Sequence, residues 1–575
     1  MSMSTPRDEN ATNAALPWIA HYPAGVDWAM PLPPQTVPSL LAAAVKRFPG
    51  QACTRFIGKT ITYQDMAAQV DRAAHGLQQL GVGKGTKVGL LLPNCPSFIV
   101  YYYATLKAGG VIVNFNPLYT VEELEFQVKD SETELMVTLD LVQLFGKVEA
   151  LIVKGTLKRA VIASFTAQLP PTKALLYRML KRKELARPAA SKVAKSVVYE
   201  KQLLANAGTP KPADIDPVED VAVLQYTGGT TGTPKGAMLT HANLTANVAQ
   251  TAAWSVGMED GKERILAILP FFHVFAMTGI MNLGIAKGAE LILLPRFVLD
   301  DTMRTIAATK PTIMPGVPTI FNAIMNHKDA RKLDLKALKI CLSGGAPLPH
   351  EVQRGFAALT GNQIIEAYGL SETSPAATFN PLDGHAKDGS IGQPLPGTTI
   401  SIRAVGEPER EMRLGEAGEI CIKGPQVMKG YWRRPAETAD AFVGAYFRTG
   451  DIGYMDNDGF IFIVDRLKDM IIASGFKVFP RKVEEAIYEH PAVEEVTVIG
   501  IKNAYRGEAP KAFIKLKAGQ SANTADILKH LEPKLSKIEM PEEIEFRSEL
   551  PKTMIGKLSK KELKAEEAAK SLKTA

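Results

Sequence analysis

A Gly/Thr-rich stretch between two apolar runs constrains the fold of this chain more than any other feature. The stretch is Tyr226-Thr-Gly-Gly-Thr-Thr-Gly-Thr-Pro-Lys-Gly236, and it lies between Val221-Ala-Val-Leu and Ala237-Met-Leu. Glycines let a backbone turn several amide groups toward one anion, and the threonine hydroxyls and Lys235 add hydrogen-bond donors and a positive charge. The pattern predicts two strands joined by a loop that holds a triphosphate.

Two other interpretations fit these residues less well. A Walker A loop requires Gly-Lys-[Ser/Thr], whereas Lys235 follows Pro234 and precedes Gly236. A flexible linker is not expected between two strand-like runs, nor with proline and lysine inside a Gly/Thr sequence. We therefore expect a phosphate-binding loop of another class.

The length and composition predict a soluble protein with at least two domains. A chain of 575 residues is longer than one hydrophobic core usually supports. Hydrophobic residues make up 46% and charged residues 22% of the chain, as in globular proteins. With 67 basic and 60 acidic residues the net charge is only +7, which argues against a protein that binds nucleic acid.

The spacing of the cysteines favours the cytoplasm as the location. The cysteines form no CxxC pair; they are Cys53, Cys95, Cys341 and Cys421. We therefore expect neither a disulfide framework nor a zinc site.

Residues 1–13 are polar, so we expect no signal peptide. The longest apolar region, 266–294, contains Lys287 and Glu290, so we expect no transmembrane helix.

Residues 1–465 form the first predicted domain, with a core that starts near residue 38. Strand-like and helix-like runs alternate here: strands are predicted at 88–93 and 111–116, and helices at 98–107 and 121–128. Such alternation is typical of α/β proteins with mainly parallel sheets. We therefore predict an α/β fold with a large N-terminal domain of several subdomains.

Residues 466–575 form the second predicted domain, with a hinge at 465–470. Helices are predicted at 482–488 and 524–535, and strands at 496–501 and 513–516. A unit of this size lies in the usual range for domains, and we expect a small, mobile α+β domain. Its last residues, 560–575, should form an exposed helix or a frayed tail.

A basic segment at 170–201 has a different composition. Two acidic residues, Glu184 and Glu200, accompany a larger basic set: Lys173, Arg178, Lys181, Arg182, Lys183, Arg187, Lys192 and Lys195. Apolar residues recur in it at helical spacing: Leu175, Leu176, Met179 and Leu180. The segment is either a solvated surface helix in an insertion or a patch that contacts anionic lipid headgroups.

Four further segments carry residues that suit a bound nucleotide. Ser343-Gly-Gly-Ala-Pro347 is a small-residue turn that lets a flat ring approach the backbone. The run from Glu366 to Ser374 combines an aromatic ring, carboxylates and hydroxyls. Phe447-Arg-Thr-Gly-Asp451 ends in a carboxylate, and Asp465-Arg466 adds an acid and a base. Pro551-Lys-Thr-Met-Ile-Gly-Lys557 places a lysine on a glycine turn.

Taken in this order with the Gly/Thr-rich stretch, these segments closely resemble the acyl-adenylate-forming superfamily of AMP-binding enzymes. The resemblance runs from about Trp18 to Leu563. The superfamily includes acyl-CoA synthetases, firefly-type luciferases and peptide-synthetase adenylation domains. Within it, the chain looks most like the bacterial long-chain fatty-acid–CoA ligases, on the residues at 113–119, 269–275, 424–432, 464–472 and 474–476.

The resemblance implies an ATP-dependent ligase with two half-reactions. A long-chain fatty acid and ATP give acyl-AMP and pyrophosphate, and the thiol of CoA then gives the thioester and AMP. ATP and CoA are the implied co-substrates, and Mg²⁺ is the implied cofactor. A carboxylate must approach the α-phosphate, so positive charge and hydrogen-bond donors must neutralise the charge that develops at phosphorus.

The resemblance also implies roles for individual residues. The backbone and hydroxyls of residues 227–233 are implied to hold the β- and γ-phosphates. The residues of this stretch expected to bind the nucleotide are Thr227, Gly228, Gly229, Thr230, Thr231, Gly232 and Lys235. Thr230 and Glu372 are implied to bind Mg²⁺, which prefers oxygen ligands, and Thr373 is expected near the α-phosphate.

The nucleoside and the reacting carboxylate have implied partners too. Tyr368 should stack on adenine beside Gly345 and Ala346, and Asp451 should accept hydrogen bonds from both ribose hydroxyls. Arg466 resembles the family arginine that also contacts the ribose. Lys557 looks like the lysine of the C-terminal domain that bridges the carboxylate and the α-phosphate.

The family implies a rotation of the small domain after adenylation, with Lys468 at the hinge. The rotation would withdraw Lys557 and bring Ser474 and Gly475 toward the CoA channel. His273 matches a family segment beside the acyl pocket.

The residues alone leave alternatives open at these positions. Glu372 could be a surface carboxylate, Asp451 a turn residue and Lys557 a solvated charge. His273 could equally be a hydrogen-bonded core residue.

The chain also departs from the family pattern at two positions. Some long-chain members have a gating tryptophan where this chain has Met277, and some relatives have a thioester-forming lysine where it has Ile472.

Several functions share these segments. The main expectation is a fatty-acid–CoA ligase, located in the cytoplasm or at the inner face of the cytoplasmic membrane, and a homodimer is compatible with it. The alternatives are a ligase for a medium-chain or aryl acid, an enzyme that loads a carrier protein, a luciferase-like oxidase and a non-catalytic ATP- or lipid-sensing protein.

Overall fold

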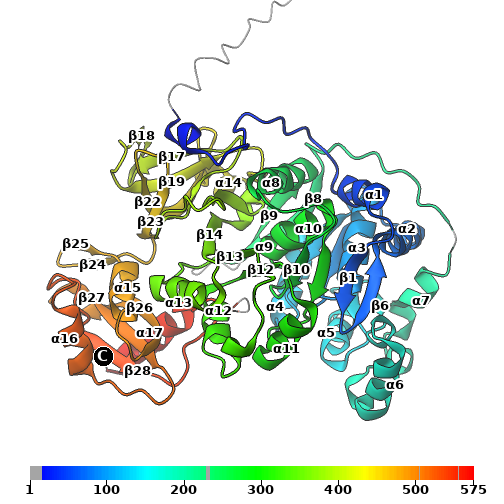
Figure 1. Ribbon diagram of the computed structural model, residues 1–575. Coiled ribbons are helices and arrows are strands. Elements are labelled where there is room, and N and C mark those ends of the chain that lie inside the picture. The colour runs from blue at the N-terminus through cyan, green and yellow to red at the C-terminus, as the bar shows by residue number, and fades with distance from the viewer. Residues whose placement is uncertain (1–15, 207, 228–232, 504, 554–555, 575) are drawn as a thin grey trace, which may run out of the picture.

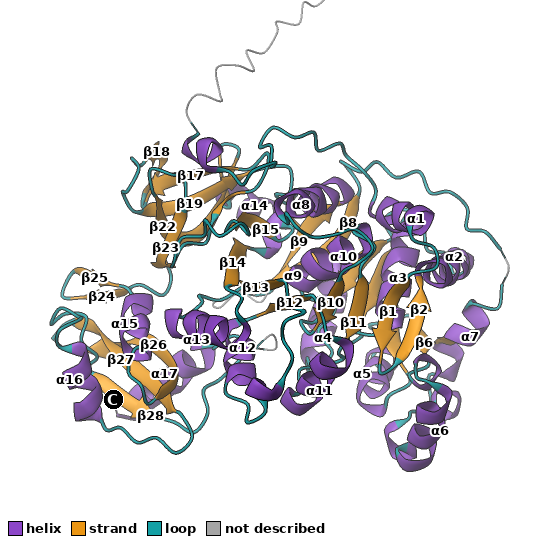
Figure 2. Ribbon diagram, in the orientation of Figure 1, coloured by secondary structure: helices purple, strands orange, loops and turns teal. Residues whose placement is uncertain are grey.

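The computed structural model describes residues 16–206, 208–227, 233–503, 505–553 and 556–574. These residues form four β-sheets with helices packed on them (Figures 1 and 2). Two large parallel-rich sheets and one antiparallel sheet precede residue 467, and the fourth sheet starts at residue 471. The fold is therefore the predicted one, α/β with a small α+β unit at the C-terminus.

A nine-stranded sheet forms one half of the large domain. In spatial order its strands are β16 (Gln393–Pro394), β15 (Ala376–Phe379), β14 (Ile364–Gly369), β13 (Ile340–Gly344), β12 (Ile313–Gly316), β10 (Arg264–Ala267), β11 (Glu290–Leu293), β1 (Ala52–Phe56) and β2 (Lys59–Thr62). The strands from β14 to β1 run parallel. The turns after β12, β13 and β14 therefore gather at one edge of the sheet, where α/β proteins commonly bind ligands.

An eight-stranded sheet forms the other half. In spatial order its strands are β20 (Gly430–Tyr431), β9 (Lys235–Thr240), β8 (Val221–Thr227), β4 (Val111–Asn114), β3 (Lys87–Leu90), β5 (Leu135–Leu139), β6 (Arg159–Ala163) and β7 (Val197–Tyr199). β8 and β9 form an antiparallel hairpin in which Thr227 pairs with Lys235. The two strands predicted around the Gly/Thr-rich stretch are thus confirmed.

An antiparallel sheet follows in the chain. Its strands are β18 (Glu407–Glu411), β17 (Thr399–Ala404), β19 (Gly418–Lys423), β22 (Tyr446–Met455), β21 (Phe442–Val443) and β23 (Ile461–Arg466). β22 pairs with β23 in a register that sets Asp451 opposite Arg466. Strand pairing therefore brings together an acid and a base that lie fifteen positions apart.

The C-terminal unit has its own sheet and core. The sheet contains β25 (Phe476–Val478), β24 (Ile471–Ala473), β27 (Gly507–Leu516), β26 (Val493–Asn503) and β28 (Glu543–Phe546). Helices α15 (Pro480–Tyr488), α16 (Thr524–Leu531) and α17 (Lys560–Thr574) accompany it. A separate apolar cluster that includes Val483, Val498 and Leu531 fills this unit. The hinge at 465–470 stays a prediction; the link between β23 and β24 spans residues 467–470.

Helices cover the large sheets (Figure 2). The α-helices before residue 467 are α1 (Val37–Arg47), α2 (Tyr63–Gln79), α3 (Pro96–Lys107), α4 (Val121–Ser131), α5 (Val142–Val153), α6 (Pro171–Leu180), α7 (Glu200–Leu203), α8 (His241–Trp254), α9 (Val274–Ala276), α10 (Leu283–Ala286), α11 (Leu299–Thr309), α12 (Pro318–Met325), α13 (His350–Thr360) and α14 (Pro435–Asp440). Thr120 and Thr240 begin α4 and α8 with capping boxes, which satisfy backbone amides at the helix start. A π-helix, η7 (Met277–Asn282), joins α9 to α10.

The elements predicted from periodicity are confirmed, with shifted ends. The predicted strands of the first domain are β3 and β4, and the predicted helices are α3 and α4. In the second domain the corresponding elements are α15, β26, β27 and α16, and residues 560–574 are helical as α17. Across the described parts of the chain, no helix combines the length and hydrophobicity needed to cross a membrane.

Candidate active site

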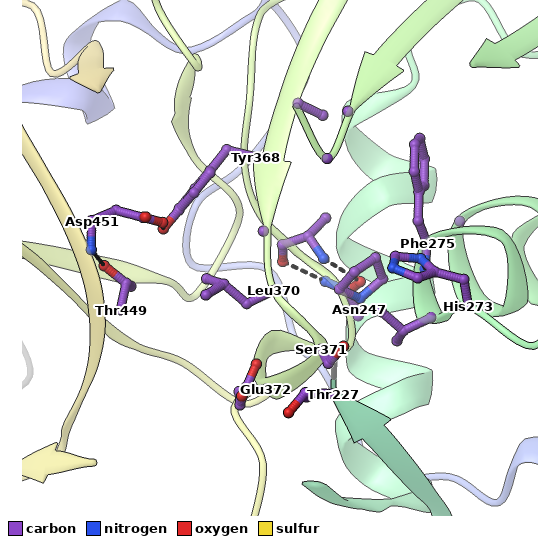
Figure 3. Close-up of a pocket in the computed structure, with 18 of the residues that line it drawn as sticks. Thr227, Asn247, His273, Phe275, Tyr368, Leu370, Ser371, Glu372, Thr449 and Asp451 are labelled. Atoms are coloured by element: carbon purple, nitrogen blue, oxygen red, sulfur yellow. Dashed lines mark hydrogen bonds between the residues drawn. The ribbon is translucent and has the colours of Figure 1, made fainter. Parts of the chain in front are cut away.

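One cavity of about 810 Å³ is lined by most of the predicted site residues that the structure describes. It lies where the turns after β13 and β14 meet the hairpin β8–β9, strands β22 and β23, and the C-terminal domain. Figure 3 shows Tyr368 and Asp451 on one side of it, Thr227 and Glu372 near one another, and His273 with Phe275 on the other side. The cavity therefore has a polar end, and an apolar branch continues from it.

A buried carboxylate organises the polar end. The phenol of Tyr368 donates a hydrogen bond to Asp451 Oδ2 at 2.6 Å, and Arg466 Nε donates one to Asp451 Oδ1 at 3.0 Å. Only 3% of Asp451 is exposed, and burial raises the pKa of Tyr368 well above its usual value, so the phenol keeps its proton. A carboxylate has about four acceptor positions, so Asp451 can accept further hydrogen bonds from a ligand while it holds Tyr368 and Arg466.

A second acidic group faces the Gly/Thr-rich stretch. Glu372 follows β14, and Tyr431 Oη donates a hydrogen bond to its Oε1 at 2.8 Å. The Nζ atom of Lys235 lies 5.0 Å from the centre of the Tyr431 ring, within cation–π range. Burial raises the pKa of Glu372. One aromatic ring thus lies between an acid and a base on the wall of the cavity.

Lys557 enters the cavity from the C-terminal domain. A Cβ atom placed on Gly345 would lie 2.7 Å from Cε and 3.0 Å from Nζ of Lys557, and Gly345 has a φ of +82°. Glycine is therefore required there both for conformation and for space. Burial, with a contribution from Arg466, lowers the pKa of Lys557 to about 8.

A hydrogen bond between described residues ties the Lys557 turn to the large domain. The hydroxyl of Thr319 in α12 donates to the carbonyl oxygen of Gly556 at 2.7 Å, and Figure 1 shows the C-terminal domain beside α12 and α13. Asn322 Nδ2, one helical turn further along α12, donates to the Glu494 carbonyl at 3.4 Å. Helix α12 thus contacts this part of the C-terminal domain through two side chains, Thr319 and Asn322.

His273 lies where the polar end meets the apolar branch. Its Nδ1 accepts a hydrogen bond from the Phe275 amide at 3.3 Å. Burial, with a contribution from Lys557, lowers the pKa of His273 to about 3, so the imidazole is neutral near pH 7. Because Nδ1 is an acceptor, the proton of the neutral ring lies on Nε2.

The apolar branch runs down between the nine-stranded sheet and two helical segments. Its sheet wall is formed by Ile313, Pro315, Ile340, Leu342 and Gly344. Ile340, Leu342 and Gly344 are alternate residues of β13 and therefore point to the same side of the sheet. From the first to the last of them the strand extends about 13 Å. The opposite wall comes from α8 and the residues just after it, from η7 and from α10. Its residues are Asn247, Thr251, Ser255, Met258, Gly279 and Leu283. The branch is therefore a long slot, and its residues accept hydrocarbon along most of its length.

Polar side chains in the branch wall are already hydrogen-bonded. Thr251 Oγ1 donates to the Asn247 carbonyl at 2.7 Å, and Ser255 Oγ donates to the Thr251 carbonyl at 2.7 Å. Asn247 Nδ2 donates to the Ala376 carbonyl at 2.7 Å. Because these groups have partners within the protein, they add little polarity to the slot.

Of the predicted site residues that the structure describes, most lie at this one cavity, but not all. Those that line it are Thr227, Lys235, His273, Gly345, Tyr368, Glu372, Asp451, Arg466 and Lys557. Ala346 lies beside it, half-buried. Thr373 is buried, and its hydroxyl donates within its own turn to the carbonyls of Pro375 and Leu370. Ser474 and Gly475 form the exposed tip of the β24–β25 hairpin and do not line the cavity in this arrangement.

Part of the predicted set lies outside the described residues: Gly228, Gly229, Thr230, Thr231 and Gly232. At the position of the gating tryptophan, Met277 is buried in η7, and the Asn114 amide donates to its sulfur at 3.2 Å. It is not among the described residues that line the cavity.

Sequence reasoning missed three contributors to the site. Tyr431 lies in a segment used only for the family resemblance, and Thr319 stands in an apolar helix with no local signal. The stripe Asn247, Thr251 and Ser255 did have a signal, because polar residues at i, i+4 and i+8 share one helix face.

The oxygen ligands of this cavity suit Mg²⁺. Glu372 supplies one buried carboxylate on the wall that also carries Thr227 and Lys235. In the described residues no group of three potential His, Cys, Asp or Glu ligands occurs. Mg²⁺ commonly binds through one or two carboxylates together with substrate phosphates, so a single carboxylate here is compatible with it.

Comparisons with known proteins match this arrangement over nearly the whole chain. A family model described as "AMP-binding enzyme" matches residues 41–432, and one described as "AMP-binding enzyme C-terminal domain" matches residues 482–557. The long-chain-fatty-acid–CoA ligase of Bacillus subtilis is 43% identical over 557 residues, which cover 96% of this chain and 98% of that protein.

Other relatives agree with these matches. The long-chain-fatty-acid–CoA ligase of Salmonella typhimurium is 36% identical, over 96% of this chain and 98% of that protein. Among solved structures, ATP-bound MatB from Rhodopseudomonas palustris superposes with a TM-score of 0.78 at 28% identity, over 92% of this chain and 99% of that one.

Proposed function

The chain belongs to the AMP-binding enzyme family, and we propose that it is an ATP-dependent ligase that converts a long-chain fatty acid into its CoA thioester. One observation carries the proposal: an apolar slot opens into a polar cavity, and Lys557 and His273 lie where the two join. A fatty acid placed in the slot would present its carboxylate at that junction. Two relatives that match over nearly the full chain carry the name long-chain-fatty-acid–CoA ligase.

In the first half-reaction, a carboxylate oxygen attacks the α-phosphorus of ATP. The bond from the α-phosphorus to the bridging oxygen breaks, and pyrophosphate leaves. We assign Lys557 to the bridge between carboxylate and α-phosphate, because its ammonium group lies over Gly345 at the junction. Charge that develops at phosphorus is best stabilised by preorganised donors in a site that excludes water.

The nucleoside is assigned to the polar end. Tyr368 supplies a ring for adenine, and Asp451 with Arg466 supplies an acceptor and donors for the ribose. Lys235 and Thr227 are assigned to the phosphates, together with the residues of the Gly/Thr-rich stretch. Glu372 is assigned to Mg²⁺, which would neutralise phosphate charge.

In the second half-reaction, the CoA thiolate attacks the acyl carbonyl, and AMP leaves. Lys557 occupies the cavity in the arrangement described here, whereas Ser474 and Gly475 are at an exposed hairpin tip. We propose that rotation about residues 465–470 exchanges them. The Thr319–Gly556 hydrogen bond is present in the arrangement that holds Lys557 in the cavity. The rotation would break it, so we expect this bond to support adenylation and not thioester formation.

Location and assembly complete the proposal. We place the enzyme in the cytoplasm, in peripheral contact with the inner face of the membrane, because a long-chain acid partitions into bilayers. The proposal includes a homodimer, which light scattering on the purified chain can test.

Release of AMP and pyrophosphate tests the proposed activity directly. Acids from about C6 to C18 and an aryl acid would be assayed with and without CoA. We expect turnover to require CoA and to rise with chain length, because each buried methylene adds about 0.8 kcal/mol. Preference for a medium-chain or aryl acid, or AMP formation that depends on a carrier protein in place of CoA, would replace the long-chain proposal.

Thr319→Val tests whether α12 positions the Lys557 turn. Valine keeps the shape of threonine but removes the donor to Gly556. A hydrogen bond of this kind contributes about 1 kcal/mol, so we expect adenylation to slow about fivefold. Conversion of supplied acyl-AMP and CoA to thioester should not change, and Thr305→Val on α11 is the matched control. Equal loss in both half-reactions would show that Thr319 has no role specific to adenylation.

A further inference from the structure

Helix α6 is attached to the protein in an unusual orientation. Lys173 Nζ donates to the Ile57 carbonyl at 2.9 Å, and the guanidinium of Arg178 donates to Thr166 Oγ1 at 2.9 and 3.1 Å. The ring of Tyr177 packs against Phe165, with centroids 4.9 Å apart. The charged and aromatic side of this helix therefore faces the protein.

The apolar side of α6 consequently faces solvent. Leu175, Leu176, Met179 and Leu180 are 61%, 55%, 69% and 77% exposed. Leu175 lies four positions before Met179, and Leu176 lies four positions before Leu180. The four side chains therefore share one face of the helix. No residue of the helix is buried. Surface helices normally bury this stripe, and a contiguous exposed apolar patch usually marks an interaction surface.

Positive charge borders this patch. Lys181, Arg182 and Lys183 follow the helix directly and are exposed. Glu184 is the acidic residue among them; it pairs with Lys181 at 2.7 Å and accepts a hydrogen bond from Tyr177. In the described parts of the chain, Arg182 and Lys183 form no salt bridge, so their charge is available to a partner.

The shape of the surface distinguishes among partners. α6 projects from the large domain on the side away from the C-terminal domain (Figure 1), and its exposed apolar side chains lie on one face of this projecting helix. An apolar ridge with a basic border suits the interface of an anionic bilayer, in which apolar side chains enter the acyl boundary and lysines contact headgroup phosphates. A folded protein partner would need a matching acidic groove.

We propose that the α6 surface, defined as Leu175, Leu176, Met179 and Leu180 with Lys181, Arg182 and Lys183, docks this protein on anionic lipid bilayers. The surface is separate from the active-site cavity, because none of these residues lines it. Docking would place the enzyme where a long-chain acid is concentrated, and in that respect alone it rests on the proposed function.

Vesicle flotation of the full-length protein tests the proposal. Vesicles would contain phosphatidylcholine alone or with about one-third phosphatidylglycerol, which supplies negative surface charge. One variant, Lys181→Gln/Arg182→Gln/Lys183→Gln, removes the basic border, and a second, Leu176→Glu/Met179→Glu, removes the apolar ridge. Matched controls are Arg331→Gln/Lys332→Gln/Lys336→Gln and Leu414→Glu, which change exposed residues elsewhere.

The expected result is preferential binding to the anionic vesicles, weakened by salt. Each removed charge should weaken binding about fivefold, the ridge variant should lose binding to both vesicle types, and the controls should bind like the unchanged protein. Equal binding of all forms, or no preference for anionic vesicles, would overturn the proposal. So would a concentration-dependent dimer that both α6 variants abolish, because the ridge would then join two copies of the chain.

A water-soluble medium-chain acid separates this proposal from the enzymatic one. Turnover of such an acid in the absence of vesicles should be the same in both α6 variants and in the unchanged protein. Vesicle binding without turnover of any acid would remove the proposed function and leave the docking surface intact. Turnover without vesicle binding would remove the docking surface and the proposed membrane contact, and would leave the proposed ligase activity intact.

Discussion

Lys557→Ala should lower the rate of acyl-AMP formation by about 10²–10³-fold, the usual effect of removing one charge-stabilising donor from a reacting centre. The ammonium group of Lys557 is the cation that the C-terminal domain places over Gly345, at the junction of the polar end and the apolar slot. Without it, two anions must approach each other at that junction. Pyrophosphate release with a fatty acid and ATP measures the effect.

The second half-reaction provides the internal control for this variant. Thioester formation from supplied acyl-AMP and CoA should proceed at the unchanged rate, because the proposed rotation removes Lys557 from the cavity. Lys561→Ala, which changes an exposed lysine of α17, should affect neither step. A comparable loss in both half-reactions would contradict the proposed exchange of the two arrangements.

The pH dependence of the first half-reaction follows from the same lysine. Its pKa is lowered to about 8, so the fraction that carries the positive charge falls as the pH rises through 8. The specificity constant for ATP should therefore decline above about pH 8, since it reports the titration of the free enzyme. In Lys557→Ala the remaining activity should lack this decline.

Gly279→Leu should shift the preference from long-chain to short-chain acids. Gly279 lies in η7, on the slot wall between Val274 and Leu283. A Cβ atom there would meet only the Phe275 ring, at 3.5 and 3.8 Å, which are ordinary contact distances. The leucine side chain can therefore enter the slot without displacing backbone, and it would fill the space that distal methylenes occupy.

The size of this shift can be estimated from the hydrocarbon that the leucine excludes. Loss of about four buried methylenes, at about 0.8 kcal/mol each, would lower the C16-to-C8 ratio of kcat/KM by about two orders of magnitude. Gly146→Leu makes the same change on α5, where a Cβ atom meets nothing within 4 Å; it should leave the ratio unchanged. An unaltered ratio in Gly279→Leu would show that the acyl chain does not use this slot.

Local patterns were sufficient for the elements and for predicting several residues that line the polar end of the cavity. The Gly/Thr-rich stretch required two strands around it, and β8 and β9 are those strands. Tyr368, Glu372, Asp451 and Lys557 were recognisable because each stands in a short segment whose residue types suit bound phosphate or nucleoside. Such segments carry their information in consecutive residues, so no knowledge of the fold is needed to find them.

The contacts among those residues were not readable in the same way. Asp451 meets Arg466 because β22 and β23 pair in one register, and Lys557 reaches Gly345 across more than two hundred intervening residues. Thr319 had no local signal, because its partner Gly556 lies in the other domain. The local partners of Thr373, the backbone carbonyls of its own turn, were not readable either, and its place near the α-phosphate stays a prediction.

Sequence patterns therefore determined the fold class and were enough to predict two domains and a nucleotide site, because these patterns depend on residues close together in the chain. Two properties came from the tertiary structure alone: the slot that follows β13, and the outward orientation of the apolar face of α6. Leucines and isoleucines have the same chemistry whether they fill a core, line a slot or face solvent. Only the positions of the surrounding elements determine which of these environments each side chain occupies.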